Sequence, residues 1–309
     1  MDPLASVNAR TDTTYALMRS ACQRGHSVWF AELTSLELQQ GTPWIRARPV
    51  DVPGQDGASS SWLGPDTWRE VSSFPITWLR KDPPFDLRYV EATWILDSVD
   101  AARCRVLNDP SGVRAANEKL YALRFPELCP PTLVSADSSR LRAFIEHHGE
   151  VVLKPLDAAG GEGILFAWRG MRGLSALLEK ATWKGARCEA QAYLPESEAG
   201  DKRILLLEGE PLGAVLRIHG PGEERNNLHL GGRAEPSTLG PEDRRIVERI
   251  APALKRDGLV LVGLDVIGGH LTEVNVTSPT CIQELERFDR SDPARKVIEW
   301  CERHAPSAD

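Results

Sequence analysis

Helical and extended patterns alternate along the first third of the chain. Residues 12–24 place Tyr15, Met18 and Cys22 on one stripe, and this spacing predicts a helix that ends at a glycine. A second helical pattern covers residues 87–102. Apolar runs that predict short strands occur at 27–33, 76–80 and 104–107. Such alternation is typical of an α/β layer with parallel strands, with the Pro- and Gly-rich residues 41–75 as hairpins or loop.

Short strands dominate the rest of the chain, beyond a boundary that we place near residue 115. Strands are predicted at 151–154, 164–168, 188–193, 203–207 and 211–218, with a final strand pair within 259–276. Helices are predicted at 172–182 and at 241–256, where Val247, Ile250 and Leu254 share one stripe. A loop of glycine and charged residues at 219–235 is a candidate for a mobile lid.

The final strand pair carries the most informative side chains. With a three-residue hairpin loop at 268–270, Asp265 faces Glu273, and Asn275 shares their face. The opposite face is then apolar apart from Thr272. A two-residue loop would shift the pairing and place the acids among apolar side chains. The pattern therefore favours the three-residue loop.

Two carboxylates that lie directly opposite each other repel, and a cation between them removes the conflict. Oxygen ligands without sulfur or imidazole favour magnesium, which proteins usually share with substrate phosphates. Asp265, Glu273 and Asn275 are therefore candidate ligands for Mg²⁺, with Mn²⁺ as an alternative ion. The same pattern also fits a solvated sheet edge with scattered acids.

A lysine and a glycine-rich loop form the second candidate element. Lys154 stands at the end of an apolar strand and precedes Gly160, Gly161 and Gly163. Glycine lets backbone N–H groups approach phosphate oxygens, and a lysine neutralises them. Plain hairpin turns have the same composition, and this loop lacks both the P-loop spacing and the GxGxxG dinucleotide fingerprint.

Several basic residues form a third set, and the fork of an arginine suits carboxylate and phosphate oxygens. They are Lys119, Lys202, Arg203, Arg225 and Arg233. Singly, each of the arginines also fits a solvated surface charge. Together with metal ligands and a phosphate loop, the set favours phosphoryl transfer, in which catalysis is mainly positioning and charge neutralisation. Cys281 has no histidine in an obvious base position, which argues against a cysteine nucleophile.

Composition narrows the function classes further. The chain has 309 residues, enough for about two domains, and a formal net charge of -7, which argues against a general nucleic-acid or anionic-membrane binder. The six cysteines contain no CxxC pair, so neither a zinc site nor a disulfide framework is predicted, and a reducing cytoplasm fits best. No window resembles a signal peptide or a transmembrane helix.

At these residues the chain resembles bacterial glutathione synthetase, a member of the ATP-grasp superfamily, along almost its whole length. The segments that carry the resemblance read MDPLASVNARTDTTYALM (1–18), RKDPPFD (80–86), NEKLYALRF (117–125), LKPLDAAGGEGI (153–164), QAYLP (191–195), GDKRILLLEGEPLG (200–213) and VGLDVIGGHLTEVNVTSPTCIQELERF (262–288). The resemblance implies an α/β (α+β) ATP-grasp fold with an N-terminal parallel-sheet domain. It implies an N-terminal substrate domain at 1–115, a central subdomain at 116–190 and a C-terminal catalytic subdomain at 191–309.

The activity that the resemblance implies is the ATP-dependent joining of γ-glutamylcysteine to glycine through an acyl phosphate, which gives glutathione, ADP and phosphate. It also implies a homotetramer. By position, Lys119, Lys154 and the glycines at 160, 161 and 163 would contact the ATP phosphates, and Gln191, Tyr193 and Leu194 would hold adenine. Asp265, Glu273 and Asn275 would bind two magnesium ions. Substrate carboxylates or the transferred phosphoryl group would meet Arg203, Arg225 and Arg233, and the peptide and glycine site would be lined by Ser278, Pro279 and Thr280.

The chain departs from the family pattern at three places. The family has a β-strand before the Met-Asp-Pro motif, so we expect a start upstream of Met1. The lid segment carries Asn226, His229 and Ala234 where the family has small residues or glycine, and Ala158 and Ala159 replace Gly and Met in the phosphate loop. The lid changes leave open a ligase of the same chemistry with a different acyl substrate or amine. The absent strand leaves open a non-catalytic ATP-binding relative.

Overall fold

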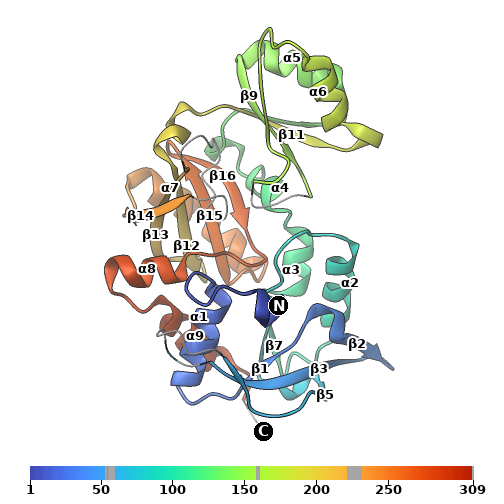
Figure 1. Ribbon diagram of the computed structural model, residues 1–309, viewed down its shortest axis with the longest axis vertical. Helices are drawn as coiled ribbons and strands as arrows, with labels where there is room; N and C mark the ends of the chain where they lie inside the picture. The colour runs from blue at the N-terminus through green and yellow to red at the C-terminus, as the bar shows by residue number, and fades with distance from the viewer. Residues whose placement is uncertain (53, 55–59, 158–160, 221–231, 308–309) are drawn as a thin grey trace.

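The structure is a computed structural model, and it describes residues 1–52, 54, 60–157, 161–220 and 232–307. Three groups of elements follow one another along its longest axis (Figure 1). A small sheet with two helices lies at one end, the N-terminal elements lie at the other end, and a five-stranded sheet lies between them. The described part of the chain has no helix that is long and apolar enough to cross a membrane.

The N-terminal elements combine an antiparallel sheet of five strands with a parallel pair. The long strand β3 is the centre of the larger sheet, in which the other four strands all pair with it in antiparallel fashion. The strands are β1 (Val28–Phe30), β2 (Leu36–Gln39), β3 (Thr42–Asp51), β4 (Ser61–Trp62) and β5 (Thr67–Glu70). The parallel pair is β6 (Ile76–Trp78) and β7 (Arg105–Leu107). The helices are α1 (Thr13–Gln23), α2 (Leu87–Leu96) and α3 (Pro110–Ala115).

The predicted parallel layer is therefore confined, within the described residues, to β6 and β7. The antiparallel sheet follows from a tight turn, because Gln40 and Gly41 both have positive φ angles, of 51° and 82°, between β2 and β3. The helix predicted over 87–102 also proves shorter, because it ends at Leu96. Beyond it, the side chain of Asp100 accepts a hydrogen bond from the Ala102 amide and competes with helical pairing.

The small sheet contains four antiparallel strands in the order β10-β9-β11-β8. They are β8 (Thr132–Ser135), β9 (Glu150–Pro155), β10 (Leu165–Trp168) and β11 (Cys188–Ala192), with helices α5 (Ser138–His148) and α6 (Leu174–Ala181). Leu141 and Ile145 of α5 and Leu178 of α6 pack on Leu153 of β9 in a closed apolar cluster. The small sheet therefore has an apolar core of its own.

The main sheet has the strand order β14-β13-β12-β15-β16 and is antiparallel throughout. Its strands are β12 (Asp201–Leu207), β13 (Glu210–Ile218), β14 (Arg233–Ser237), β15 (Leu261–Ile267) and β16 (His270–Asn275). The helices of this part are α4 (Glu118–Ala122), α7 (Pro241–Arg256), α8 (Ile282–Asp289) and α9 (Pro293–His304). The stripe predicted on α7 packs against Leu264, while Leu205 on the opposite face packs against α8 and α9.

The hairpin between β15 and β16 corrects one prediction and confirms another. The loop has two residues, not three, because Ile267 pairs with His270 across Gly268 and Gly269. A register shift after Asp265 then restores the predicted opposition of Asp265 and Glu273. The bulge is stabilised by Thr272, whose hydroxyl donates to the Asp265 carbonyl oxygen at 3.1 Å.

Asn108 joins the N-terminal elements to the main sheet. This side chain is 3% exposed. Its Nδ2 donates to the carbonyl oxygens of Leu261 (2.9 Å) and Val276 (2.7 Å). Its Oδ1 accepts from the amides of Val260 (2.8 Å) and Leu261 (2.9 Å). One amide group thus satisfies four backbone groups of the main sheet, including the exit of β16.

We expect Asn108→Ala to lower the free energy of unfolding by about 3 kcal/mol, because it leaves buried backbone donors and acceptors without partners. Urea unfolding followed by circular dichroism measures the loss. Asn8→Ala is the control, because Asn8 is exposed and its side chain accepts one hydrogen bond from the described residues, that of the Arg10 amide. A loss for Asn108→Ala no greater than that for Asn8→Ala would contradict the joining role.

Candidate active site

A large cleft opens between the small sheet and the main sheet. It has a volume of about 1110 Å³, and residues from both sheets, from the N-terminal segment and from the 278–280 segment line it. Ligand pockets for one small molecule usually enclose ~300–1,000 Å³. The cleft therefore has room for more than one small ligand at the same time.

The predicted metal ligands lie together in this cleft. Asp265 and Glu273 face each other across β15 and β16, and Asn275 pairs with Gly263 two residues further along. The Asn275 amide nitrogen donates to the Gly263 carbonyl oxygen at 3.3 Å, which leaves its Oδ1 directed elsewhere. No cluster of three or more His, Cys, Asp or Glu side chains suited to a metal occurs in the described ranges. The donor set is instead two carboxylates and one amide oxygen, which are the hard ligands that magnesium accepts.

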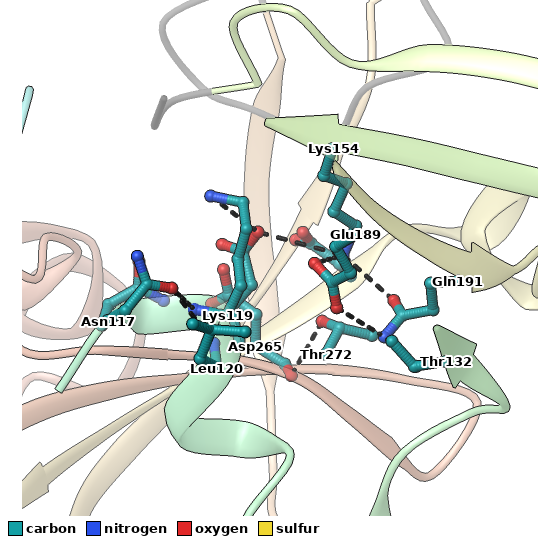
Figure 2. A network of polar contacts seen from close by, with 12 residues as sticks. Asn117, Lys119, Leu120, Thr132, Lys154, Glu189, Gln191, Asp265 and Thr272 are labelled. Carbon is teal, nitrogen blue, oxygen red and sulfur yellow. Dashed lines mark hydrogen bonds and ion pairs between the residues drawn. The ribbon is translucent and has the colours of Figure 1, made fainter. Parts of the chain in front are cut away.

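The two predicted lysines approach Glu273 from different elements. The Nζ atoms of Lys119, in α4, and Lys154, in β9, lie 4.0 Å and 3.9 Å from Glu273 Oε1. Lys154 Nζ also donates to Gln191 Oε1 at 3.0 Å and lies 4.0 Å from Glu189 Oε2. Figure 2 shows Lys119 on one side of this network and Lys154, Glu189 and Gln191 on the other. Two ammonium groups thus converge on one carboxylate, where they could equally meet phosphate oxygens.

Glu189 is the buried carboxylate of this network. Its side chain is 0% exposed, and its Oε2 has no hydrogen-bond partner within the described residues. Burial raises the pKa of Glu189, while the nearby Lys154 opposes that rise. Burial also raises the pKa of Glu118, to about 7, and the neighbouring Glu273 adds to the shift. Burial therefore favours the protonated forms of two carboxyl groups in or beside the cleft, and the nearby lysines oppose this effect.

The metal-ligand candidate Asp265 also belongs to a largely buried quartet of two arginines and two aspartates that lines the cleft. Arg203 donates to Asp265 through Nε (2.5 Å) and Nη2 (3.0 Å). Arg217 donates to both Asp201 oxygens at 2.6 Å, and its Nη2 lies 2.9 Å from Asp265 Oδ2. Burial disfavours ionised Asp265, but the two arginines outweigh it and hold its pKa well below the usual range. Burial raises the pKa of Asp201 against the pull of Arg217.

Gly263 makes the quartet sterically possible. A Cβ at this position would lie 3.0 Å from Arg203 Cδ and 3.0 Å from Pro279 Cβ. The bare backbone therefore lets the Arg203 side chain pass between β15 and the 278–280 segment to reach Asp265.

The 278–280 segment is held by the N-terminal elements. Ser278 donates its hydroxyl to Asp82 Oδ1 at 2.5 Å, and the buried Arg80 donates to the Pro279 carbonyl oxygen at 3.0 Å. All three residues of the predicted segment, Ser278, Pro279 and Thr280, line the cleft. The RKDPPFD motif therefore positions this wall of the cleft.

The phosphate loop and the strand after it also reach the cleft. Gly161 lines it, and Gly161 and Gly163 have positive φ angles of 82° and 69°. A Cβ at Gly163 would lie 2.8 Å from Pro155 Cγ, so a larger residue does not fit. Gln191, Tyr193 and Leu194 line the same cleft. Gly160, Ala158 and Ala159 lie outside the described residues.

Two predicted arginines stand apart from this arrangement. Arg233 is the first residue of β14, where its side chain is 65% exposed, pairs with Glu235 at 2.8 Å and does not line the cleft. The predicted loop 219–235 therefore ends in a strand. Arg225, Asn226 and His229 lie outside the described residues.

Sequence reasoning missed several groups that the fold brings to the cleft. Arg217 and Asp201 pair across β12 and β13, and a lone arginine in the apolar run of β13 was the available signal. Glu284, in the first turn of α8, is 2% exposed and lines the cleft. Its Oε1 accepts from Arg287, while its Oε2 has no partner among the described residues.

Comparison with known proteins agrees with this geometry. The family model for the prokaryotic glutathione synthetase N-terminal domain matches residues 1–114, and that for the prokaryotic glutathione synthetase ATP-grasp domain matches residues 118–290. The glutathione synthetase of Thermosynechococcus vestitus is 45% identical over 309 residues, with 97% of each chain covered. That of Vibrio cholerae is 42% identical over 305 residues, which cover 98% of this chain and 96% of the relative.

Solved structures support the fold. The ATP-grasp ligase PsnB, complexed with a minimal precursor, Mg and ADP, superimposes with a TM-score of 0.62 at 17% identity over 96% of both chains. A RiPP-associated ATP-grasp ligase of Chryseobacterium gregarium, in complex with ADP and a leader and core peptide, gives a TM-score of 0.64 at 15% identity, covering 97% of this chain and 95% of that one. The expected ATP-grasp fold and the family resemblance are thus both confirmed. The chain belongs to the prokaryotic glutathione synthetase family.

Proposed function

We propose that this chain ligates γ-glutamylcysteine to glycine at the expense of ATP and releases glutathione, ADP and phosphate. The observation that carries the proposal is the convergence of Lys119 and Lys154 on Glu273, opposite Asp265, in a cleft between two sheets. Membership of the glutathione synthetase family supplies the substrate class.

The reaction has two steps. An oxygen of the cysteinyl carboxylate attacks the γ-phosphorus of ATP, and ADP leaves with the electron pair of the broken P–O bond. The neutral amine of glycine then attacks the carbonyl carbon of the acyl phosphate. The C–O bond to phosphate breaks, the amine loses a proton, and phosphate is released. Activation is required because a free carboxylate is a poor electrophile.

The residues that we expect to position the ligands lie in different parts of the cleft. Lys119, Lys154 and the glycine loop would contact the nucleotide phosphates, and Gln191, Tyr193 and Leu194, which line the cleft, would form the wall for adenine. We assign the cysteinyl end of the acyl substrate to Ser278, Pro279 and Thr280. The Oε2 of buried Glu284, which lacks a partner in the described part of the chain, suits the ammonium group that a γ-glutamyl peptide carries.

Asp265, Glu273 and Asn275 would hold magnesium, and manganese could replace it. When bound, the ion would neutralise charge on the phosphates. Asp265 is bonded to Arg203 and Arg217, so ion binding has to share or displace one of these contacts. Arg203, Arg225 and Arg233 remain our candidates for substrate carboxylates or the transferred phosphoryl group. Arg233 would have to move toward the cleft, because it pairs with Glu235 outside it.

We also propose the division into units at 1–115, 116–190 and 191–309, a homotetrameric assembly and a cytoplasmic location. The apolar cluster of the small sheet is separate and supports the central unit, whereas one apolar cluster spans both the N-terminal elements and the main sheet. The six free cysteines, five of which are buried, fit a reducing compartment.

The test is direct. Purified protein with ATP, magnesium, γ-glutamylcysteine and glycine should form glutathione and ADP in equal amounts, and chelation of the metal should stop both. A panel of amino acids in place of glycine examines the alternative acceptor. Product from another amine at a comparable rate would replace glycine in the proposal, and ADP release without any peptide product would overturn it.

A further inference from the structure

Three consecutive residues at the start of α4 each contact a different segment in or beside the cleft. Asn117 caps the helix by accepting from the amides of Lys119 (3.2 Å) and Leu120 (3.1 Å), and its Nδ2 donates to the Leu156 carbonyl oxygen at 2.8 Å. Lys119 lies 4.0 Å from Glu273. Between them, Glu118 accepts the hydroxyl of Thr277 through Oε1 at 3.0 Å.

The location of α4 allows these contacts to connect separate parts of the site. The helix lies where the small sheet meets the main sheet (Figure 1), and Figure 2 shows its first turn beside the Lys154 network. Leu156 begins the phosphate loop, Glu273 belongs to the main sheet, and Thr277 precedes the 278–280 segment. The three contacts start from consecutive residues at the beginning of α4, so a shift of one of these residues displaces its bonded neighbours.

Thr277 occupies the link between two parts of the site. It is 4% exposed and stands between Asn275, a metal-ligand candidate, and Ser278, which faces the acyl substrate in the proposed function. Its hydroxyl donates a hydrogen bond to Glu118, which belongs to α4 and not to its own segment. A carboxylate beside Glu273 is electrostatically unfavourable, so an apolar residue at position 118 would pack there at lower cost.

We propose that Glu118 is a positioning residue that couples occupancy of the nucleotide phosphates at Lys119 to the conformation of the 278–280 segment through the Thr277 hydroxyl. The identity of the two ligands rests on the proposed function. In-line transfer requires the γ-phosphorus and the attacking carboxylate to be aligned, and small displacements are costly. The hydrogen bond between Glu118 and Thr277 fixes the position of α4, which carries Lys119, relative to the 278–280 segment.

The first arm of the test uses only a non-hydrolysable ATP analogue with magnesium. Hydrogen exchange followed by mass spectrometry should show that the analogue slows exchange in peptides covering residues 276–284 of the wild-type protein. This protection should be lost in Thr277→Val and Glu118→Ala, although both variants still bind the analogue. It should persist in Thr277→Ser and Glu118→Gln, which keep the donor and the acceptor. Protection that survives in Thr277→Val would overturn the proposal, as would its loss in both conservative variants.

The second arm measures kinetics at saturating ATP. Thr277→Val should raise KM for γ-glutamylcysteine about tenfold, a factor typical of one hydrogen bond to a charged group, while KM for ATP changes less than about twofold. Adding Glu118→Ala to Thr277→Val should produce no further tenfold rise, because both remove the same contact. Additive effects would contradict the coupling.

A matched control and the two-arm design separate the possible failures. Thr182→Val removes a hydroxyl bond of 2.8 Å to the Leu178 carbonyl oxygen in α6, away from the cleft, and should change neither readout. If the wild-type protein forms no glutathione, the proposed substrates are wrong. The hydrogen-exchange experiment still tests whether Glu118 couples the two sites, because it requires only the nucleotide analogue and magnesium.

Discussion

Glu273→Gln should lower the turnover of ATP-dependent ligation by about a hundred- to a thousandfold, a loss comparable to that of one preorganised electrostatic contact to a transition state. Glu273 is the carboxylate on which Lys119 and Lys154 converge, and it faces Asp265 across the hairpin. The amide keeps the size of the side chain but removes the charge that holds both ammonium groups and the proposed ion. Coupled measurement of ADP and of glutathione follows the loss.

The matched control for this variant is Glu210→Gln in the same sheet. Glu210 stands at the start of β13, its side chain is 78% exposed, and its partner Lys255 lies at 3.4 Å on the surface. We expect its turnover to equal that of the wild type, and the unfolding midpoints of both variants to stay within a few degrees of it. Retention of more than a tenth of wild-type turnover in Glu273→Gln would remove Glu273 from the reaction.

Arg217→Met should lower the free energy of unfolding by about 3–5 kcal/mol, the range found when one partner of a buried ion pair is removed. Asp201 loses two hydrogen bonds of 2.6 Å, and Arg203 is then the one cation that Asp265 keeps among the residues the structure describes. Methionine retains most of the side-chain volume, so the loss measures uncompensated charge more than a cavity. Denaturant unfolding at pH 7 provides the number.

The pH dependence of this loss has a defined sign. In the wild type, the arginines hold the pKa of Asp265 below its unfolded value of ~3.9, so this group contributes stability above that pH and loses it on acidification. Burial raises the pKa of Asp201, which acts in the opposite direction. Without Arg217 both carboxyl groups bind protons more tightly in the folded state. The difference between variant and wild type should therefore be largest near pH 7 and shrink below about pH 4.

Arg295→Met is the surface control. Arg295 pairs with Glu299 one turn along α9 at 2.8 Å, and its side chain is 59% exposed. Such a pair contributes ~0.5 kcal/mol or less. A loss for Arg217→Met as small as that for Arg295→Met, or one that does not vary with pH, would show that the quartet is not a stabilising unit.

The local sequence was sufficient wherever the signal lay in one continuous segment. The helix predicted at 241–256 has these bounds in the structure, and the apolar face of the β15–β16 hairpin identified the acid pair. The loop length was wrong because a bulge at Thr272 absorbs one residue, and alternation alone does not distinguish a longer loop from a bulge. Helices α5, α8 and α9 were not predicted, although α8 and α9 close the second face of the main sheet.

By itself the sequence determined the acidic hairpin, the two lysines, the glycine loop and the family to which the chain belongs, because each of these can be recognised from a short continuous segment of the chain. The tertiary structure decided which groups meet. Arg217 reaches Asp265 because β12 lies between β13 and β15, and Lys119 and Lys154 approach Glu273 because α4 stands at the junction of two sheets. Such contacts depend on the order in which strands pair, and residues far apart in the chain carry no local pattern that specifies that order.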